Sequence, residues 1–398
     1  MIYFDNSATT KPCKAAIDAA LKASEEVFAN PSSLHFAGSA AAEMLLDARN
    51  ELLAAIHGST IRAKLPRKPE MRGGEEYGRL IFTTSGTESD NLAIRGIIAS
   101  TRIKNPEIIT TNSEHPAVLE TVRELEKSGV KAHYLKTAGG KIDLNELKSK
   151  LNSNTALVSV MHVNNETGAI YDLKEIFSTV KAISPDAVCH ADCVQSFQKL
   201  LFTPKSICAD LITVSAHKVH GLKGVGALWI SKELAQKNRP YPIIFGGGQE
   251  SGVRPGTENV PGIAAFGAAV KANGSDKAAI RFGENALKMR ELLVSMLNPE
   301  VKVNECEGNT APHIISLTLP VPKSQPMLNY LSALGICVSS GSACSSHKNT
   351  VSHVLTAFGL TNTEADSTIR VSLDDSNTES EIEEFCQALS DGIEKLGK

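Results

Sequence analysis

One lysine of this chain, Lys218, lies where an amine can do chemistry instead of being solvated at a surface. It comes shortly after residues 209–214, a short apolar run that predicts a buried strand. Its neighbours in residues 215–221 are two histidines, a serine and small or apolar residues, with no other formally charged side chain. Desolvation and nearby polar groups lower the pKa of a lysine, and imine formation requires a neutral amine. We therefore predict that Lys218 holds a carbonyl cofactor as a Schiff base.

A lysine-bound pyridoxal phosphate has four further requirements, and the chain has candidate residues for each of them. The phosphate needs N–H donors and hydroxyls at a helix N-terminus. The pyridine nitrogen needs an acid that keeps it protonated, the flat ring needs a stacking partner, and the phenolic oxygen needs a hydrogen-bond donor. The candidates, in that order, are Gly86, Thr87 and Ser89; Asp192; His115; and Asn165 and Gln195.

The segments that must position these residues alternate between short apolar runs and helical patterns over residues 80–230. This alternation predicts an α/β domain with a mainly parallel sheet. The polar clusters follow directly after the predicted strands, and in open α/β sheets the ligand crevice lies outside the carboxyl ends of the strands. One cofactor site can therefore collect all of them.

Pro116 suits the first position of a helix, which places His115 at the N-cap.

A second, smaller α+β domain is predicted after residue 263, where a long helical stretch leads into another alternation. We expect residues 16–262 to form the large cofactor-binding domain, and residues 1–15 together with 263–398 to form the small domain. A capping box at residues 378–381 predicts the start of the last helix. Apolar side chains at positions 382, 385, 389 and 393 give that helix one packing face.

The composition excludes several classes of function. Hydrophobic residues make up 42% and charged residues 21% of the 398 residues, which is typical of a globular protein. The net charge of −3 gives no indication of nucleic-acid or membrane partners, and no apolar stretch is long enough to cross a bilayer. The eight cysteines contain no Cys-x-x-Cys pair. We expect free thiols in a reducing cytoplasm, most of them small buried hydrophobes, and no metal site.

The motifs of this chain, taken in order, resemble those of a known enzyme family. The chain resembles the cysteine desulfurases of the NifS/IscS type, which belong to the class V aminotransferase-like enzymes of fold type I. The resemblance runs nearly end to end and implies a large domain with a mainly parallel seven-stranded sheet plus a smaller α+β domain. The matching segments are residues 3–10, 30–35, 87–89, 114–115, 162–168, 190–195, 215–218, 247–259, 339–344 and 369–373.

The resemblance also implies a role for each candidate side chain, with pyridoxal phosphate as the cofactor. The lysine would bind it and later move the substrate's Cα proton, and a histidine would stack on the ring and take part in proton transfer. The implied assignments are Lys218 and His115 for those two roles; Asp192 for the pyridine nitrogen; Gln195 for the ring oxygen; Thr87, Ser215 and His217 for the phosphate; Thr257 from the other subunit of a homodimer; and Asn165 and Arg370 for the substrate carboxylate.

Cys344 is the implied nucleophile. It lies in residues 339–349, a small, polar, glycine-containing segment of the kind that forms mobile loops, where a thiol is accessible and can ionise. Its thiolate would attack the sulfur of L-cysteine, leaving L-alanine and a persulfide on Cys344. This segment resembles the type of cysteine desulfurase that serves scaffold proteins. We therefore expect sulfur transfer to an iron–sulfur scaffold or another acceptor, for iron–sulfur cluster assembly or other thio-cofactors.

Three features depart from the family's usual pattern. Ser85 replaces a glycine in the phosphate loop, which puts the turn geometry in question. The segment 61–79 is longer than the family's short turn, is rich in charged residues, proline and glycine, and is predicted to form a solvated loop. Asp374 stands where a glycine commonly follows the Arg-x-Ser-Leu motif.

Three alternatives stay open at this point. A zinc site of a hydrolase could draw on the cysteines and histidines between 189 and 220, although their spacing is irregular and the lysine would go unexplained. A selenocysteine lyase would share the cofactor site, but it need not depend on a nucleophilic cysteine, so Cys344 favours the desulfurase. A catalytically silent paralogue that only binds a scaffold protein would not need Lys218, His115, Cys344 and Arg370.

Overall fold

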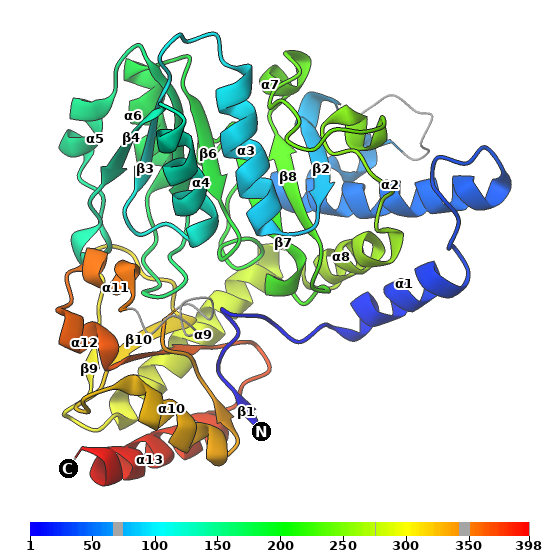
Figure 1. Ribbon diagram of the computed structural model, residues 1–398. Coiled ribbons are helices and arrows are strands. Elements are labelled where there is room, and N and C mark those ends of the chain that lie inside the picture. The colour runs from blue at the N-terminus through cyan, green and yellow to red at the C-terminus, as the bar shows by residue number, and fades with distance from the viewer. Residues whose placement is uncertain (67–74, 275, 342–350, 398) are drawn as a thin grey trace.

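The computed structural model of the chain describes residues 1–66, 75–274, 276–341 and 351–397 (Figure 1). Its centre is a seven-stranded sheet in which β8 is antiparallel to both of its neighbours and the remaining neighbours are parallel. The predicted α/β fold with a mainly parallel sheet is thereby confirmed. In spatial order the strands are β2 (Arg79–Thr83), β8 (Gly226–Ile230), β7 (Leu211–Ser215), β6 (Val188–Asp192), β5 (Thr155–Met161), β3 (Glu107–Thr111) and β4 (Lys131–Leu135).

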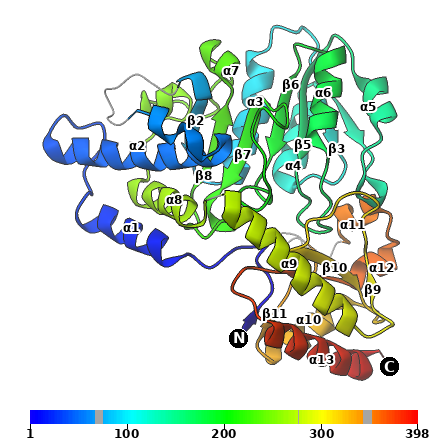
Figure 2. The same ribbon diagram turned by 180° about the vertical axis from the view of Figure 1, so that it is seen from behind.

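Helices cover both faces of this sheet, as Figures 1 and 2 show from opposite sides. Side chains that alternate along the strands divide between two apolar clusters, because successive residues of a strand point to opposite faces. One cluster packs under α3 (Gly86–Ser100), α4 (Pro116–Lys127) and α7 (Lys232–Gln236). The other packs under α2 (Phe36–His57), α5 (Leu144–Lys150), α6 (Leu173–Ile183) and α8 (Val260–Asn273).

Two small sheets lie below the large one in Figure 1. One has the order β12 (Thr368–Ser372), β10 (Ile314–Thr318), β9 (Lys302–Val303), and the other pairs β1 (Ile2–Tyr3) with β11 (Ile336–Cys337). A third apolar cluster joins them to α9 (Asp276–Met296), α10 (Ser324–Ala333) and α13 (Glu379–Leu396). The remaining helices are α1 (Lys14–Glu25), α11 (His353–Phe358) and α12 (Asn362–Asp366). The domain boundaries given above stay a prediction.

Both predicted helix starts are confirmed. His115 is the N-cap of α4, and its Nδ1 accepts the N–H of Ala117 at 3.1 Å. Thr378 and Glu381 form the capping box of α13, whose residues 382, 385, 389 and 393 are all buried in the third cluster. Among the described residues no helix is long and apolar enough to span a membrane.

Two expectations were wrong in part. Residues 61–65 are not a solvated loop, because Ile61 and Leu65 are buried against the α2 side of the sheet; a 3₁₀ helix, Ser59–Lys64, carries the first of them. Residues 67–74 lie outside the described ranges. The seven cysteines of the described ranges are free, but only Cys189, Cys193 and Cys386 are buried, and the other four are partly exposed. Three of these four, Cys13, Cys208 and Cys306, pack at the edge of an apolar cluster, where one side of the side chain stays exposed.

Candidate active site

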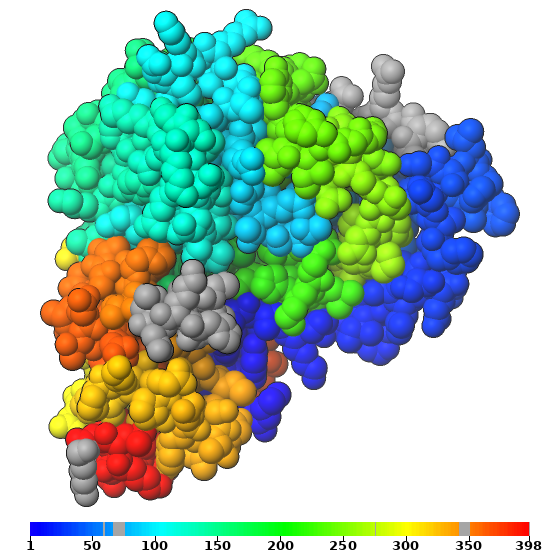
Figure 3. All heavy atoms as spheres, viewed as in Figure 1, coloured from blue at the N-terminus to red at the C-terminus, as the bar shows by residue number. Residues whose placement is uncertain are grey.

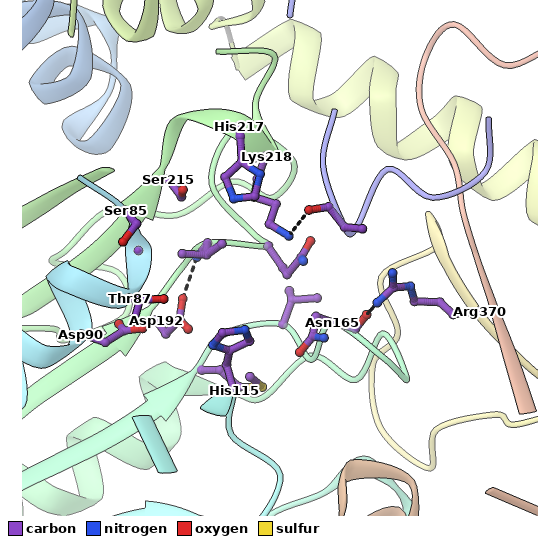
Figure 4. A pocket seen from close by; sticks show the side chains of 16 residues that line it. Ser85, Thr87, Asp90, His115, Asn165, Asp192, Ser215, His217, Lys218 and Arg370 are labelled. Carbon is purple, nitrogen blue, oxygen red and sulfur yellow. Dashed lines mark hydrogen bonds between the residues drawn. The ribbon is translucent and has the colours of Figure 1, made fainter. Parts of the chain in front are cut away.

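A cavity of about 220 Å³ opens at the carboxyl ends of β5, β6 and β7 (Figure 4). The N-terminus of α3, the N-terminal segment around Ala8 and strand β12 complete its walls. Ten of the predicted residues line it, although they come from segments up to 284 residues apart along the chain. The ten are Gly86, Thr87, His115, Asn165, Asp192, Gln195, Ser215, His217, Lys218 and Arg370.

Lys218 ends a short 3₁₀ turn, Ala216–Lys218, that follows β7. Its ammonium donates to the carbonyl oxygens of Ser7 and Ala8, the latter at 2.8 Å. Burial, together with the nearby charges of Arg370 and Lys199, lowers the pKa of Lys218 to about 7. Lys218 is thus an amine that is substantially neutral near pH 7, which is the form that attacks a carbonyl.

The start of α3 forms an anion-binding corner of the cavity. Ser85 caps the helix by accepting the N–H of Glu88 at 3.2 Å, in an extended conformation (φ −170°) that any residue can adopt. The missing glycine therefore does not disturb the turn. A Cβ on Gly86 would lie 3.0 Å from Val194, so the start of the helix lies close to the loop that follows β6. The exposed Thr87 lines the corner, whereas Ser89 is buried behind it and bonds Thr83, which removes it from the phosphate candidates.

Ser215 and His217 face this corner from the end of β7 (Figure 4). The Nδ1 of His217 lies 3.2 Å from the hydroxyl of Thr9. Burial and the adjacent Lys218 lower the pKa of His217 to about 3, so its ring is neutral at pH 7. Hydroxyl, imidazole and helix N–H groups together form a set that can bind a phosphate.

Asp192 is the last residue of β6 and lies on the floor of the cavity. Burial raises its pKa, while the N–H of Val194, 2.9 Å from Oδ1, and the charge of Lys218 oppose that rise. Gln195 donates from Nε2 to the carbonyl of Ser7 at 2.9 Å, and its Oε1 has no partner. A carboxylate held by one N–H can pair with a protonated ring nitrogen.

His115 faces Asp192 across the cavity (Figure 4). Because its Nδ1 accepts the Ala117 N–H, the proton of the neutral ring belongs on Nε2. Burial and Lys218 lower the pKa of His115 to about 4, so the ring stays neutral at pH 7. The preceding Glu114 is fully buried and accepts the N–H of Met161 at 3.0 Å, which ties the α4 start to the end of β5.

Arg370 enters from β12 and is 2% exposed. Its Nη1 donates to the carbonyl of Asn165 at 2.8 Å and its Nη2 to Asp5 at 2.7 Å, while its buried Nε has no partner. Asn165 presents its side chain to the same cavity. A guanidinium held at the cavity wall can bind a carboxylate.

Of the residues that the resemblance implies, Thr257 is exposed and does not line the cavity. Cys344 lies outside the described residues. Among the residues that the structure describes, no three His, Cys, Asp or Glu side chains come together as metal ligands. The zinc alternative therefore has no ligand set in that part of the chain.

Sequence reasoning missed three acidic residues of the site: Asp5, Asp90 and Glu114. Asp5 and Glu114 belong to segments already singled out, the motifs at 3–10 and 114–115, but no pattern showed which side chains they would contact. Asp90 lies in a helix with no distinguishing spacing. Only the packing of α3 onto the sheet brings it to the cavity.

The cavity fits pyridoxal phosphate. Three of its lining residues have buried polar atoms without a hydrogen-bond partner: Gln195 Oε1, Asp90 Oδ1 and Arg370 Nε. Such atoms are rare in folded proteins and are expected where a ligand completes the bonding. Apolar walls from Ala8, Met161, Val163 and Val194 suit a flat ring. The residues suited to hold it are the amine, the α3 corner and Asp192.

Comparisons with known proteins agree with this geometry. A family model described as Aminotransferase class-V matches residues 69–385. Over its whole length the chain is 35% identical to a cysteine desulfurase of Trichormus azollae, 94% of which is covered. A solved NifS-like protein superposes with a TM-score of 0.86 at 32% identity, covering 99% of this chain and all of that one. SspA, solved in complex with cysteine, has a TM-score of 0.78 at 30% identity, with 94% of this chain and 99% of SspA covered.

Proposed function

Because the chain belongs to the class-V aminotransferase family, as one of its cysteine desulfurases, we propose that Lys218 binds pyridoxal phosphate and Cys344 receives the sulfur of L-cysteine. The observation that carries this proposal is the desolvated amine of Lys218 in one cavity with Asp192 and Arg370. When bound, the cofactor supplies an electron sink that makes bonds at the substrate's Cα and Cβ labile.

The chain's own residues bind and orient the substrate. Arg370 and Asn165 take its carboxylate, with Arg370 already held in place by Asp5. Lys218, whose lowered pKa of about 7 makes a neutral amine available near pH 7, accepts the proton at Cα and later returns it. His115 stays neutral and, with its proton on Nε2, can donate into the cavity. The apolar walls exclude water from these transfers.

Sulfur leaves through Cys344. Its thiolate attacks the substrate's Sγ, so that an S–S bond forms as the Cβ–Sγ bond breaks. The electron pair of the broken bond leaves with Cβ, which takes a proton to become the methyl group of L-alanine. The persulfide then passes its outer sulfur to an acceptor thiol or an iron–sulfur scaffold.

A homodimer is part of this proposal. Thr257 is exposed and would reach the phosphate of a second copy. Large apolar side chains are exposed in the link between α1 and α2 and at the start of α2: Phe28 in the link is 77% exposed, and Phe36, the first residue of α2, is 90% exposed. Figure 3 shows this projecting N-terminal edge in blue. Exposed apolar patches of this kind mark protein interfaces.

The test is an absorbance spectrum of the purified protein before and after L-cysteine, with alanine assayed in the same tube. We expect a yellow protein whose band shifts as alanine appears. Lys218→Ala should lose the band, and Cys344→Ala should keep it but lose catalytic alanine and sulfide release. Cys208→Ala is the matched control, because Cys208 is a partly exposed thiol away from the cavity. Normal turnover by Cys344→Ala contradicts the persulfide step, and a protein that cannot be loaded contradicts the assignment of Lys218.

A further inference from the structure

A buried row of polar side chains lies on one face of the large sheet, under α3. Ser159 of β5, His190 of β6 and Thr213 of β7 point to this face, because they keep the two-residue alternation of their strands. His190 Nδ1 lies 2.8 Å from the Ser159 hydroxyl, and Nε2 lies 3.0 Å from the Thr213 hydroxyl. Asp192 lies on the same face, two residues after His190, where the row meets the cavity.

Asp90 of α3 closes this row from the helix side. Its side chain is 1% exposed and also lines the cavity, beside Thr87 and Asp192 in Figure 4. One carboxyl oxygen, Oδ1, lies 3.6 Å from His190 Nε2, beyond hydrogen-bond distance, and has no partner. Asp90 and Asp192 are therefore two carboxyl groups buried in one place.

Only one of these two groups can be ionised at low cost, because neighbouring carboxylates repel each other and both side chains are buried. Asp192 accepts the N–H of Val194 and feels the charge of Lys218. The Thr213 hydroxyl favours the charged form of Asp90, whereas the charges of Asp192 and Glu114 disfavour it. His190 supplies no cation, because burial lowers its pKa to about 3. The negative charge is favoured on Asp192.

We propose that Asp90 is a positioning residue that stays protonated and so keeps the negative charge of the carboxyl pair on Asp192. The inference rests on the proposed function, in which Asp192 pairs with the cofactor's ring nitrogen. A charge shared between the two carboxyl groups would weaken that pairing. In keeping with this assignment, burial and Asp192 raise the pKa of Asp90 well above its ordinary range.

The test is infrared difference spectroscopy of the full-length, cofactor-loaded protein at pH 7, wild type minus Asp90→Asn. We expect the carbonyl-stretch band of a protonated carboxylic acid, which a merely structural Asp90 carboxylate would not produce. A difference that contains only carboxylate bands overturns the proposal. Glu114→Gln is the matched control, since its band belongs to a different buried carboxyl group. Should Asp90→Asn fail to fold, Asp90→Ala gives the same difference spectrum.

Kinetics of the same variants supply a second readout. Asp90→Asn, which is neutral and similar in shape, should change kcat by less than about threefold, whereas Asp192→Asn should lower kcat by about a hundredfold or more. A large loss in Asp90→Asn with little loss in Asp192→Asn would place the charge on Asp90 and contradict the proposal. The infrared result does not depend on turnover. A protein that makes no alanine but shows the Asp90 acid band would refute the proposed function, while the protonated state of Asp90 would stand.

Discussion

Lys218 combines two features that oppose each other: it donates hydrogen bonds as an ammonium, yet its surroundings disfavour the charge. With its pKa at about 7, the neutral fraction of the amine rises as the pH rises through 7, far below the ordinary lysine value of about 10.4. We predict that cofactor uptake by the cofactor-free protein accelerates with a midpoint near pH 7. Stopped-flow absorbance between pH 5.5 and 9 measures it.

Lys199 provides the control for this midpoint, because its positive charge contributes to lowering the pKa of Lys218. Lys199→Met removes that charge and should move the midpoint to higher pH. A midpoint that stays where an exposed lysine titrates, in both proteins, would show that Lys218 is not desolvated.

Arg370 makes the second residue-scale prediction. It holds Asn165 and Asp5 through different nitrogens, a fork that lysine cannot reproduce. Arg370→Lys should raise KM for L-cysteine by about 10- to 100-fold, the range that a lost charged hydrogen bond of about 1.5–3 kcal/mol gives. Steady-state alanine formation measures it. Arg290→Lys, at an ion pair with Glu305 far from the cavity, should leave KM unchanged.

At the scale of elements, the start of α3 carries Ser85 in place of the family's usual glycine. Its hydroxyl caps the helix, and its backbone is extended. Ser85→Ala should cost about 1 kcal/mol of unfolding free energy, and Ser85→Gly only a few tenths. Urea unfolding of the cofactor-free protein compares the two. Equal losses in both variants would mean that the cap contributes nothing.

Elements whose signals are local were predictable from the sequence. His115 before Pro116 and the capping box of α13 gave correct helix starts, because capping involves residues only two or three positions apart. The apolar runs between residues 80 and 230 predicted the alternation of strands and helices for the same reason, although β4 and β8 were not identified individually. Ile61 and Leu65 were misjudged, since their charged neighbours dominate the composition while the two apolar side chains find the core through tertiary packing.

The sequence predicted which residues belong to the site, but it did not predict which contacts they make. Parallel strands bring their carboxyl ends to one edge, so Asp192 and Lys218 could be placed together from the order of elements alone. Asp90 could not, because nothing in a helical pattern says which strand end its side chain will meet. Ser89 was misplaced for a related reason: its hydroxyl turns back to Thr83 and not toward the cavity.

At the scale of the whole molecule, an ion pair joins the loop after Lys218 to the segment that directly follows β12, the strand that carries Arg370. His220 Nε2 lies 3.1 Å from Asp374, one of the residues that departs from the family pattern. Burial lowers the pKa of His220, but the hydrogen bond and charge of Asp374 outweigh it, so the pKa is raised. Burial likewise opposes ionisation of Asp374, yet His220 and Ser376 lower its pKa to about 2.

These two pKa shifts determine how the contribution of the pair to stability changes with pH. The stability that His220 contributes is fully present below its unfolded pKa and is lost as the pH rises through its raised folded pKa. The stability that Asp374 contributes is fully present above its unfolded pKa and is lost as the pH falls toward 2. The pair therefore stabilises most between about pH 4 and 6.5. Asp374→Asn should cost roughly 1–2 kcal/mol in that window and less above pH 8.

Thermal unfolding as a function of pH measures this difference. Asp375→Asn is the matched control, because the contacts of Asp375 are long and exposed: Arg281 lies 3.8 Å away and the side-chain amide of Asn285 3.5 Å away. A cost for Asp374→Asn that is the same at pH 5.5 and pH 9 would contradict the role given to His220.

Asp5 and Arg370 meet across 365 residues of chain. During synthesis, a nascent chain that has emerged only as far as Lys218 carries the amine and Asp192 but lacks the guanidinium that Asp5 holds in the finished protein. The last wall of the cavity arrives with β12, which is synthesised well after Lys218. A product truncated before β12 thus has the lysine proposed to bind the cofactor but lacks the arginine proposed to bind the substrate carboxylate, so we expect it not to turn over cysteine.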